Sequence, residues 1–216
     1  VNIGEMVIPK VRDFEVTGDG SANAWKKASW HSLVRVAGTH PYETKAKVLY
    51  STTGIYFLFD CPDKQLTCTM KNDFDNIFTE DVVEVFLWPD EKKPLYLEYE
   101  LSPLNVELNI LVPNHNSAFF GWRPWHYNGT RVPRRATSVR GGRKASKAKV
   151  EAWMAEFFLP FSLFSGVCDT PKKGTQWRAN WYRIDYDFNH STQWAWCPKT
   201  KSNFHDYKNF GSITFG

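Results

Sequence analysis

The stretch DVVEVFLW, residues 81–88, decides the fold class of this chain. Successive side chains of a strand point to opposite faces, so the aliphatic Val83, Val85 and Leu87 share one face. The opposite face carries Glu84 between aliphatic and aromatic neighbours. This alternation with a period of two predicts a β-strand that covers a core with one of its faces.

The same pattern continues outward from this stretch in both directions. Upstream, IYFLFD (55–60) follows the turn-forming STTG (51–54), and downstream YLEYEL (96–101) alternates again. Further strands are predicted at residues 106–112, 149–159, 175–185 and 211–215. Helical periodicity is nearly absent, since PFSLFSG (160–166) alone reads as a short helical turn. The pattern predicts an all-β fold, an antiparallel β-sandwich that is jelly-roll-like with little helix.

Length and composition fit a single domain. All-β domains often run to roughly 200–250 residues undivided, and the chain has 216 residues without an interdomain linker or repeat. We therefore take residues 1–216 as one domain. Aromatic residues make up 16% of the chain and Trp occurs ten times. For any single Trp a place in the core is the favoured interpretation, but the surplus suggests that some rings lie at a surface, stacked on a flat ligand.

The charge is unevenly distributed. Residues 131–149 carry eight Lys or Arg and no acid, and removing these charges from the net +4 leaves −4 for the rest. The segment contains Gly141-Gly142 and few apolar residues, so it reads as an exposed loop. Three interpretations stay open: a solvated loop, which is favoured, a binding site for an acidic glycan, and, last, a nucleic-acid contact. We expect no nucleic-acid partner, because no nucleic-acid motif accompanies the charges.

Several functional classes lack their sequence signals. No run of 18 apolar residues is present, so no membrane span is predicted. The six histidines and four cysteines show no zinc-type spacing, although Cys61 and Cys68 could close a short disulfide loop. Motifs of serine hydrolases and nucleotide-binding proteins are absent as well. No cofactor is expected to be required, no metal ligands are assigned, and calcium is left open.

One face of the central strands collects carboxylates. Glu84, Glu98 and Glu100 fall on the strand face that also carries aromatic rings, with the last two about 6–7 Å apart by strand rise. Carboxylates accept hydrogen bonds from sugar hydroxyls while rings cover the apolar face of a pyranose. The same pair spacing would suit a glycosidase, and a solvated outer sheet face is the ordinary alternative.

The C-terminal third is the part densest in aromatic and polar groups. Trp177 and Trp181 are expected in the sandwich core. Trp194 and Trp196 are also two residues apart, and we expect at least one of them to point outward beside Gln193.

The ordered segments together are similar to one known family. They are IPKVRDFEVTGDGSANAW (8–25), IYFLFD (55–60), DNIFTEDVVEVFLWPD (75–90), YLEYELSPLN (96–105), WMAEFFLPF (153–161), WRANWYRID (177–185), WCP (196–198) and FHDYKNFGSITF (204–215). This set resembles the family 9 carbohydrate-binding modules, specifically the family 9-like domains of sugar-degrading bacteria, over essentially the whole chain.

The resemblance implies a β-sandwich in which two aromatic rings clamp a sugar while Glu, Asn, Gln and Arg side chains bind its hydroxyls. Glu84 matches the sugar-binding glutamate, Trp196 the second ring and Gln193 an amide partner. The first ring is expected six residues before Glu84. This chain has Phe78 there instead of Trp, and a phenyl ring offers less stacking area than an indole. The candidate set is completed by Glu98, Glu100, Asn180, Arg183 and Trp194.

Three functions follow as hypotheses. The first is a non-catalytic module that holds a saccharide, secreted, periplasmic or at the cell surface of a bacterium, in polysaccharide degradation and as part of or partner to a glycoside hydrolase. The second is a glycoside hydrolase or lyase that uses the face of Glu84, Glu98 and Glu100. The third is a structural sandwich that docks within a larger protein.

Overall fold

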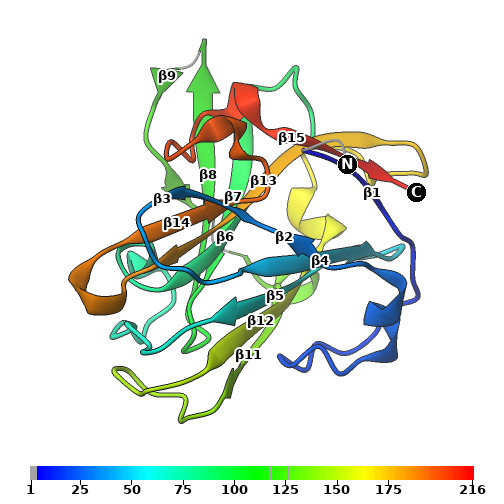
Figure 1. The fold of residues 1–216 in the computed structure, drawn as a ribbon. Helices are drawn as coiled ribbons and strands as arrows, with labels where there is room; N and C mark the ends of the chain where they lie inside the picture. Colours follow the sequence, from blue (N-terminus) through cyan, green and yellow to red (C-terminus); the bar gives the residue numbers. More distant parts are fainter. Residues whose placement is uncertain (1–3, 117, 126) are drawn as a thin grey trace.

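Two β-sheets pack face to face in the computed structural model (Figure 1), which describes residues 4–116, 118–125 and 127–216. The described residues contain no α-helix, and the predicted turn at 160–166 contains one of seven 3-10 helices. These are η1 (Asn23–Lys27), η2 (Ile77–Thr79), η3 (Gly129–Arg131), η4 (Phe161–Phe164), η5 (Asp187–Asn189), η6 (Pro198–Thr200) and η7 (Tyr207–Asn209). The predicted all-β sandwich is confirmed.

The larger sheet carries ten strands and is mostly antiparallel. Its main path is β1 (Glu5–Ile8), β15 (Gly211–Phe215), β13 (Gln176–Asp185), β6 (Val82–Trp88), β7 (Leu95–Leu101), β8 (Glu107–His115) and β10 (Arg123–Pro124). Off this path lie β14 (Thr192–Ala195), β3 (Val34–Ala37) and β9 (Ala118–Phe119). The strand predicted from residues 81–88 is thus β6, in the middle of the sheet.

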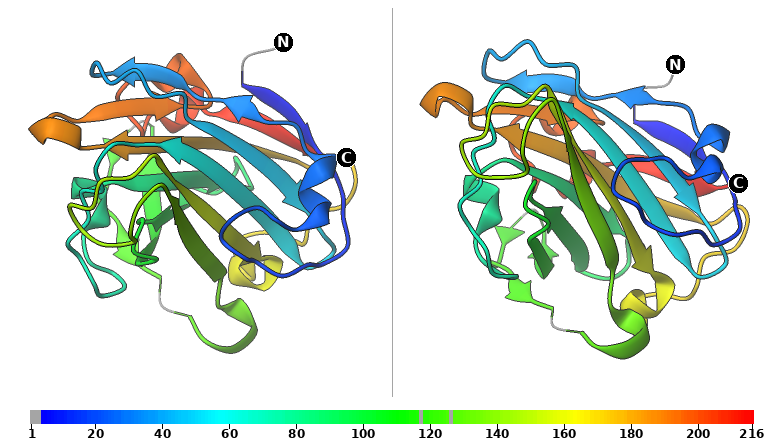
Figure 2. Two further views of the ribbon diagram at one scale, coloured as in Figure 1. Left: turned by 60° about the horizontal axis from the view of Figure 1, so that its bottom comes forward. Right: turned by 90° about the horizontal axis from the view of Figure 1, so that it is seen from below.

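The smaller sheet has five strands, and Figure 2 looks onto it from below. Its order is β11 (Arg134–Arg140), β12 (Ala152–Pro160), β5 (Gly54–Pro62), β4 (Lys45–Tyr50) and β2 (His31–Ser32). Glu156 of β12 is fully buried, and its Oε2 accepts hydrogen bonds from Thr17, Gly18 and Gly20 while its Oε1 accepts one from the indole of Trp25. One carboxylate therefore fixes the N-terminal segment across this sheet.

The main core lies between the sheets and follows the predicted alternation. Val83, Val85 and Leu87 face this core together with Trp177 and Trp181 of β13. The aromatic rings of this core pack against one another in edge-to-face and stacked pairs. The many Trp side chains are therefore accommodated largely inside the sandwich.

The outer face of the larger sheet is not solvated. The side chains of β6 that alternate with the core residues, Phe86 and Trp88 among them, form a second buried cluster. Residues 197–210, which we call the covering segment, lie on this face through the rings of Phe204, Tyr207 and Phe210. The glutamates on this face are therefore buried.

The basic segment 131–149 is not one exposed loop, so that prediction is wrong. Residues Arg134–Arg140 form β11, the edge strand beside β12. Arg135 pairs with Asp73 at 2.7 Å and with Glu107 at 3.0 Å. Charged residues on an edge strand discourage pairing with other chains, and pairing within the fold neutralises part of the positive field.

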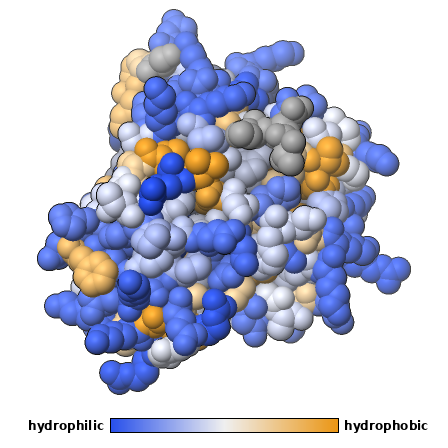
Figure 3. All heavy atoms as spheres, viewed as in Figure 1, coloured by the Kyte–Doolittle hydropathy of each residue, from blue (hydrophilic) through white to orange (hydrophobic). Residues whose placement is uncertain are grey.

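Two further sequence questions are answered by the structure. All four cysteines are free thiols, so Cys61 and Cys68 do not form a disulfide here. Across the described ranges no helix has the length and apolar character that a membrane span requires. On the face of the molecule in Figure 3 the surface is mainly hydrophilic, with apolar side chains in small separated groups.

Candidate functional site

A cavity of about 290 Å³ opens between the outer face of the larger sheet and the covering segment. Strands β6 and β7 contribute Glu84, Glu98 and Glu100 to its lining, and β14 contributes Gln193. Phe78, from the turn η2, lies in the same lining. Five of the nine sequence candidates therefore meet in one place.

Strand register explains why the three glutamates meet. Glu84 of β6 lies directly opposite Glu100 of β7, and Glu98 lies two residues from Glu100 on the same face. All three are buried, with exposed fractions between 0% and 4%. Like charges at opposite positions of a sheet destabilise it, so this arrangement is a cost to the fold.

Burial raises the pKa of all three carboxyl groups. For Glu84 the main cause is desolvation, followed by the charge of Glu98, and its pKa lies well above the usual value. Desolvation raises the pKa of Glu98 to about 8. The pKa of Glu100 also lies well above the usual value, through desolvation and then through its two glutamate neighbours. These groups hold protons at pH values where exposed glutamates are ionised.

Two aromatic residues that sequence reasoning missed stand at the cavity. Phe119 lines it with 52% of its surface exposed, and Trp122 lies beside it half-buried. The ring of Phe119 lies 4.6 Å from that of His205, which shares a 2.6 Å hydrogen bond with Tyr96. Aromatic density in residues 118–125 was the available signal, but only the fold brings this segment to the glutamates.

The tryptophans of the C-terminal third lie in the main core, which corrects the expected clamp. Trp196 is 6% exposed and stacks on Trp181 at 4.0 Å, and Trp194 is 2% exposed over the guanidinium of Arg183. Residues two apart on a strand share a face, so neither ring has to point outward. Trp196 is therefore not the second ring at this cavity.

Two polar candidates are also occupied inside the fold. Asn180 is fully buried; its amide donates to the carbonyl of Cys197 and its Oδ1 accepts from two backbone N–H groups. Arg183 is fully buried, and its guanidinium contacts Asp63 at 3.1 Å and Asp185 at 2.6 Å. Because these partners engage them, the two side chains are structural and do not line the cavity.

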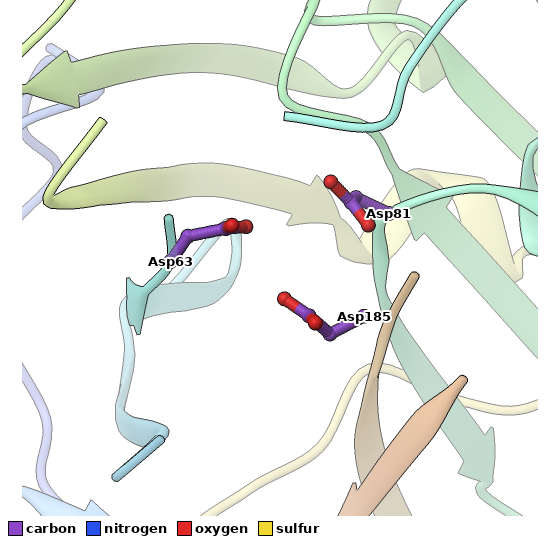
Figure 4. Close-up of side chains that lie close together, drawn as sticks. All are labelled: Asp63, Asp81 and Asp185. Atoms are coloured by element: carbon purple, nitrogen blue, oxygen red, sulfur yellow. The ribbon is translucent and has the colours of Figure 1, made fainter. Parts of the chain in front are cut away.

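A second group of acids lies away from the cavity. Carboxylate oxygens of Asp63, Asp81 and Asp185 lie within 4.8 Å of one another, and Figure 4 shows the three side chains directed toward a common space. They come from the ends of β5 and β13 and from the start of β6. Desolvation raises the pKa of Asp63 to about 7 and that of Asp81 well above its usual value. Sequence reasoning did not identify this group.

The aspartate group fits calcium in ligand type. Calcium takes carboxylate and carbonyl oxygens, and the group offers three buried carboxylates. Asp63 and Asp185 also contact the guanidinium of Arg183, and Asp185 contacts the ring of His40. Both oxygens of Asp81 also accept backbone N–H groups, from Thr67 and Tyr186. A cation here would share Asp63 and Asp185 with Arg183, and its charge would favour the ionised form of the three carboxyl groups.

Comparison with known proteins adds a family match and a fold match. Residues 16–216 match the family model described as carbohydrate family 9 binding domain-like. A Bacteroides uniformis protein to which carbohydrate binding has been provisionally assigned superposes with a TM-score of 0.81 at 15% identity, covering 98% of this chain and 99% of that one.

Two structures of a family 9 carbohydrate-binding module from Caldicellulosiruptor kristjanssonii, with cellotriose and with glucose, superpose with TM-scores of 0.69 at 14% identity. They cover 98% of this chain and 93% and 95% of theirs. At these identities the likeness shows the fold alone. No curated protein matches the sequence.

Proposed function

Since the chain belongs to the carbohydrate family 9 binding domain-like family, we propose that the cavity at Glu84, Glu98 and Glu100 is its saccharide site. The observation that carries this proposal is the meeting of buried carboxyl groups with open aromatic rings in one pocket. Apart from the contact between Glu98 and Glu100 themselves, both oxygens of Glu100 and one of Glu98 have no hydrogen-bond donor among the described residues. Sugar hydroxyls would supply the missing donors.

The aromatic side of the pocket supports the same proposal. Phe78 and Phe119 line it with part of their rings accessible, and Trp122 adds a larger ring. Aromatic rings cover the apolar C–H face of a pyranose, and a buried ring contact is worth about 1–3 kcal/mol. Phe119 thus replaces Trp196 in the clamp that the family resemblance implies.

Binding without catalysis is the function that the site chemistry favours. A glycosidase pair needs environments that separate two pKa values, so that one carboxyl is protonated while the other is ionised. Here burial raises the pKa of all three glutamates in the same direction. A docking sandwich would leave no reason for unpartnered carboxyl groups inside a pocket.

We propose a β-1,4-linked glucan or a chemically related chain as the ligand class. The C. kristjanssonii module binds cellotriose and glucose. The test is a glycan array followed by calorimetric titration with cellotriose. Phe119→Ala should weaken binding about tenfold or more, whereas Phe188→Ala, 65% exposed and outside the pocket lining, is the matched control.

If no neutral or charged glycan on the array binds, the proposed function is wrong. If a glycan binds but Phe119→Ala and Phe188→Ala behave alike, the function holds and the pocket assignment fails. A reducing-end release assay on the bound glycan tests the catalytic alternative directly.

We place the domain outside the cytoplasm of a bacterium, acting in polysaccharide degradation together with a glycoside hydrolase. The support is the family match and the bacterial origin of its structural neighbours. An acidic glycan on 131–149 has weaker support, because Arg135 is already paired with two acids. We also propose calcium at Asp63, Asp81 and Asp185, in a structural role, since none of the three lines the pocket.

A further inference from the structure

The pocket carboxyl groups have no cationic partner among the residues that the structure describes. No Lys or Arg is among the described residues that line the cavity. Arg183 follows Tyr182, the residue of β13 that lies opposite Glu84, but its side chain points to the other face of the sheet. Buried acids are normally paired with cations or supplied with donors, so this pocket is an exception.

The contrast with the other buried acids is informative. Glu107 is paired with Arg135, and Asp63 with Arg183. Glu156 receives hydrogen bonds from backbone and side-chain donors. Where a glutamate or aspartate of this fold has a structural role, the fold supplies its partner.

The other titratable groups that face the three carboxyls carry no positive charge at neutral pH. They are Tyr96 on β7, Tyr182 on β13, Tyr186 after β13 and His205 in the covering segment. Burial lowers the pKa of His205 to about 4, so its imidazole is neutral above that pH. The pocket therefore presents only acids and neutral groups to a ligand.

A metal ion does not account for the arrangement. Among the described residues, the one group of side chains whose ligand atoms lie close enough together to hold a metal is Asp63, Asp81 and Asp185. The three glutamates line an open cavity of about 290 Å³, which has room for an organic ligand.

We propose that the preferred ligand of this pocket is a saccharide with free, protonated amino groups, as in a de-N-acetylated β-1,4-linked glucosamine chain. An ammonium group on the sugar would donate charge-assisted hydrogen bonds to the oxygens of Glu98 and Glu100, which no other described side chain or backbone N–H reaches. This inference rests on the proposed function and names its substrate class. A uronic acid carries no ammonium donor and would gain no such interaction.

The proton balance follows from the same geometry. Before binding, Glu98 and Glu100 lie close enough for one protonated carboxyl to donate a hydrogen bond to the other. An ammonium group stabilises the ionised form of both, so binding at neutral pH releases protons from the carboxyls to solvent. At acidic pH the carboxyls stay protonated, and the preference for the amino sugar should shrink.

The experiment uses three disaccharides that differ only at C2. Cellobiose, N,N′-diacetylchitobiose and fully de-N-acetylated chitobiose are titrated calorimetrically, in two buffers of different ionisation enthalpy. We expect the de-N-acetylated sugar to bind at least about tenfold more tightly than cellobiose at neutral pH. The heat should depend on the buffer for that sugar only.

Variants locate the effect. Glu98→Gln and Glu100→Gln should each reduce the amino-sugar preference severalfold, and Glu151→Gln, on an exposed residue outside the pocket, should leave it unchanged. Melting curves of each variant confirm that it is folded, and two pocket variants are used in case one does not fold.

Equal or tighter binding of cellobiose overturns the inference and leaves saccharide binding intact. Failure of all three sugars to bind also overturns it, and the glycan array then decides the proposed function separately. If the preference for the amino sugar persists in both Glu98→Gln and Glu100→Gln, the ammonium group binds elsewhere. That result also refutes the assignment of the ammonium group to Glu98 and Glu100.

Discussion

Glu98→Gln should stabilise the protein at neutral pH, because the pocket acids are costly to the fold. The folded state raises the pKa of Glu98 from 4.5 to about 8. A raised carboxyl pKa means that the folded state holds the proton more tightly, so its stabilising contribution is complete below the unfolded pKa and is lost as pH rises toward 8. Glutamine resembles the protonated acid and does not titrate.

The expected gain in the free energy of unfolding follows from the interval between the unfolded and folded pKa values of Glu98. Each pH unit between the two pKa values removes about 1.4 kcal/mol, so this one group costs about 3 kcal/mol between pH 5 and pH 7.5. Near pH 5 the variant and the parent should be about equally stable. Near pH 7.5 the variant should melt roughly 6–12 °C higher, given about 2–4 °C per kcal/mol for a chain of this size.

The assay is thermal unfolding, followed by near-ultraviolet circular dichroism, at a series of pH values. Glu151→Gln, on an exposed side chain, serves as the control and should show no pH-dependent difference from the parent. A difference between Glu98→Gln and the parent that is constant with pH would refute the reasoning, since it would mean that Glu98 is ionised alike in both states.

Three other outcomes are expected. Trp196→Ala should lower the free energy of unfolding by about 3–5 kcal/mol, read from urea denaturation; an effect on saccharide affinity without one on stability would contradict its place in the core. Glu156→Gln should cost about 3 kcal/mol, because an amide NH2 replaces one of two buried acceptor oxygens and leaves donors of the fold unpaired; an unchanged urea midpoint would contradict this. Calcium at about 100 times its Kd should stabilise the parent by about 2.7 kcal/mol, and Asp81→Asn should abolish the gain; no gain in the parent would mean that the aspartates do not bind calcium.

The fold could be predicted because the apolar residues that alternate along the sequence are the ones that face the core. Val83, Val85 and Leu87 share the inner face in sequence and in structure. The strand β11 was missed because its residues, RRATSVR, are too polar for a hydrophobic period. This strand forms because it pairs with β12. Such a long-range interaction is not contained in the strand propensity of single residues.

The site could be predicted in part for a related reason. Strand period placed Glu98 and Glu100 on one face, and register brought Glu84 opposite. The burial of this face depends on where the covering segment lies, and the approach of Phe119 depends on where β9 lies. Neither position could be predicted from strand period. Trp196 was misplaced because it was assigned to the clamp by its match to the family's motif, whereas in the structure its ring stacks on that of Trp181 in the core.

The parallel pairing of β1 with β15 has a consequence for chain connectivity. Gly216 donates its N–H to the carbonyl of Ile8, so the last residue lies about four strand residues, roughly 13 Å, from the start of β1 (Figure 1). A linker of about five or six residues could join these ends, and new ends could be opened at Gly141-Gly142, in the turn after β11. Such a circular permutant should keep the pocket, since every strand would retain its neighbours.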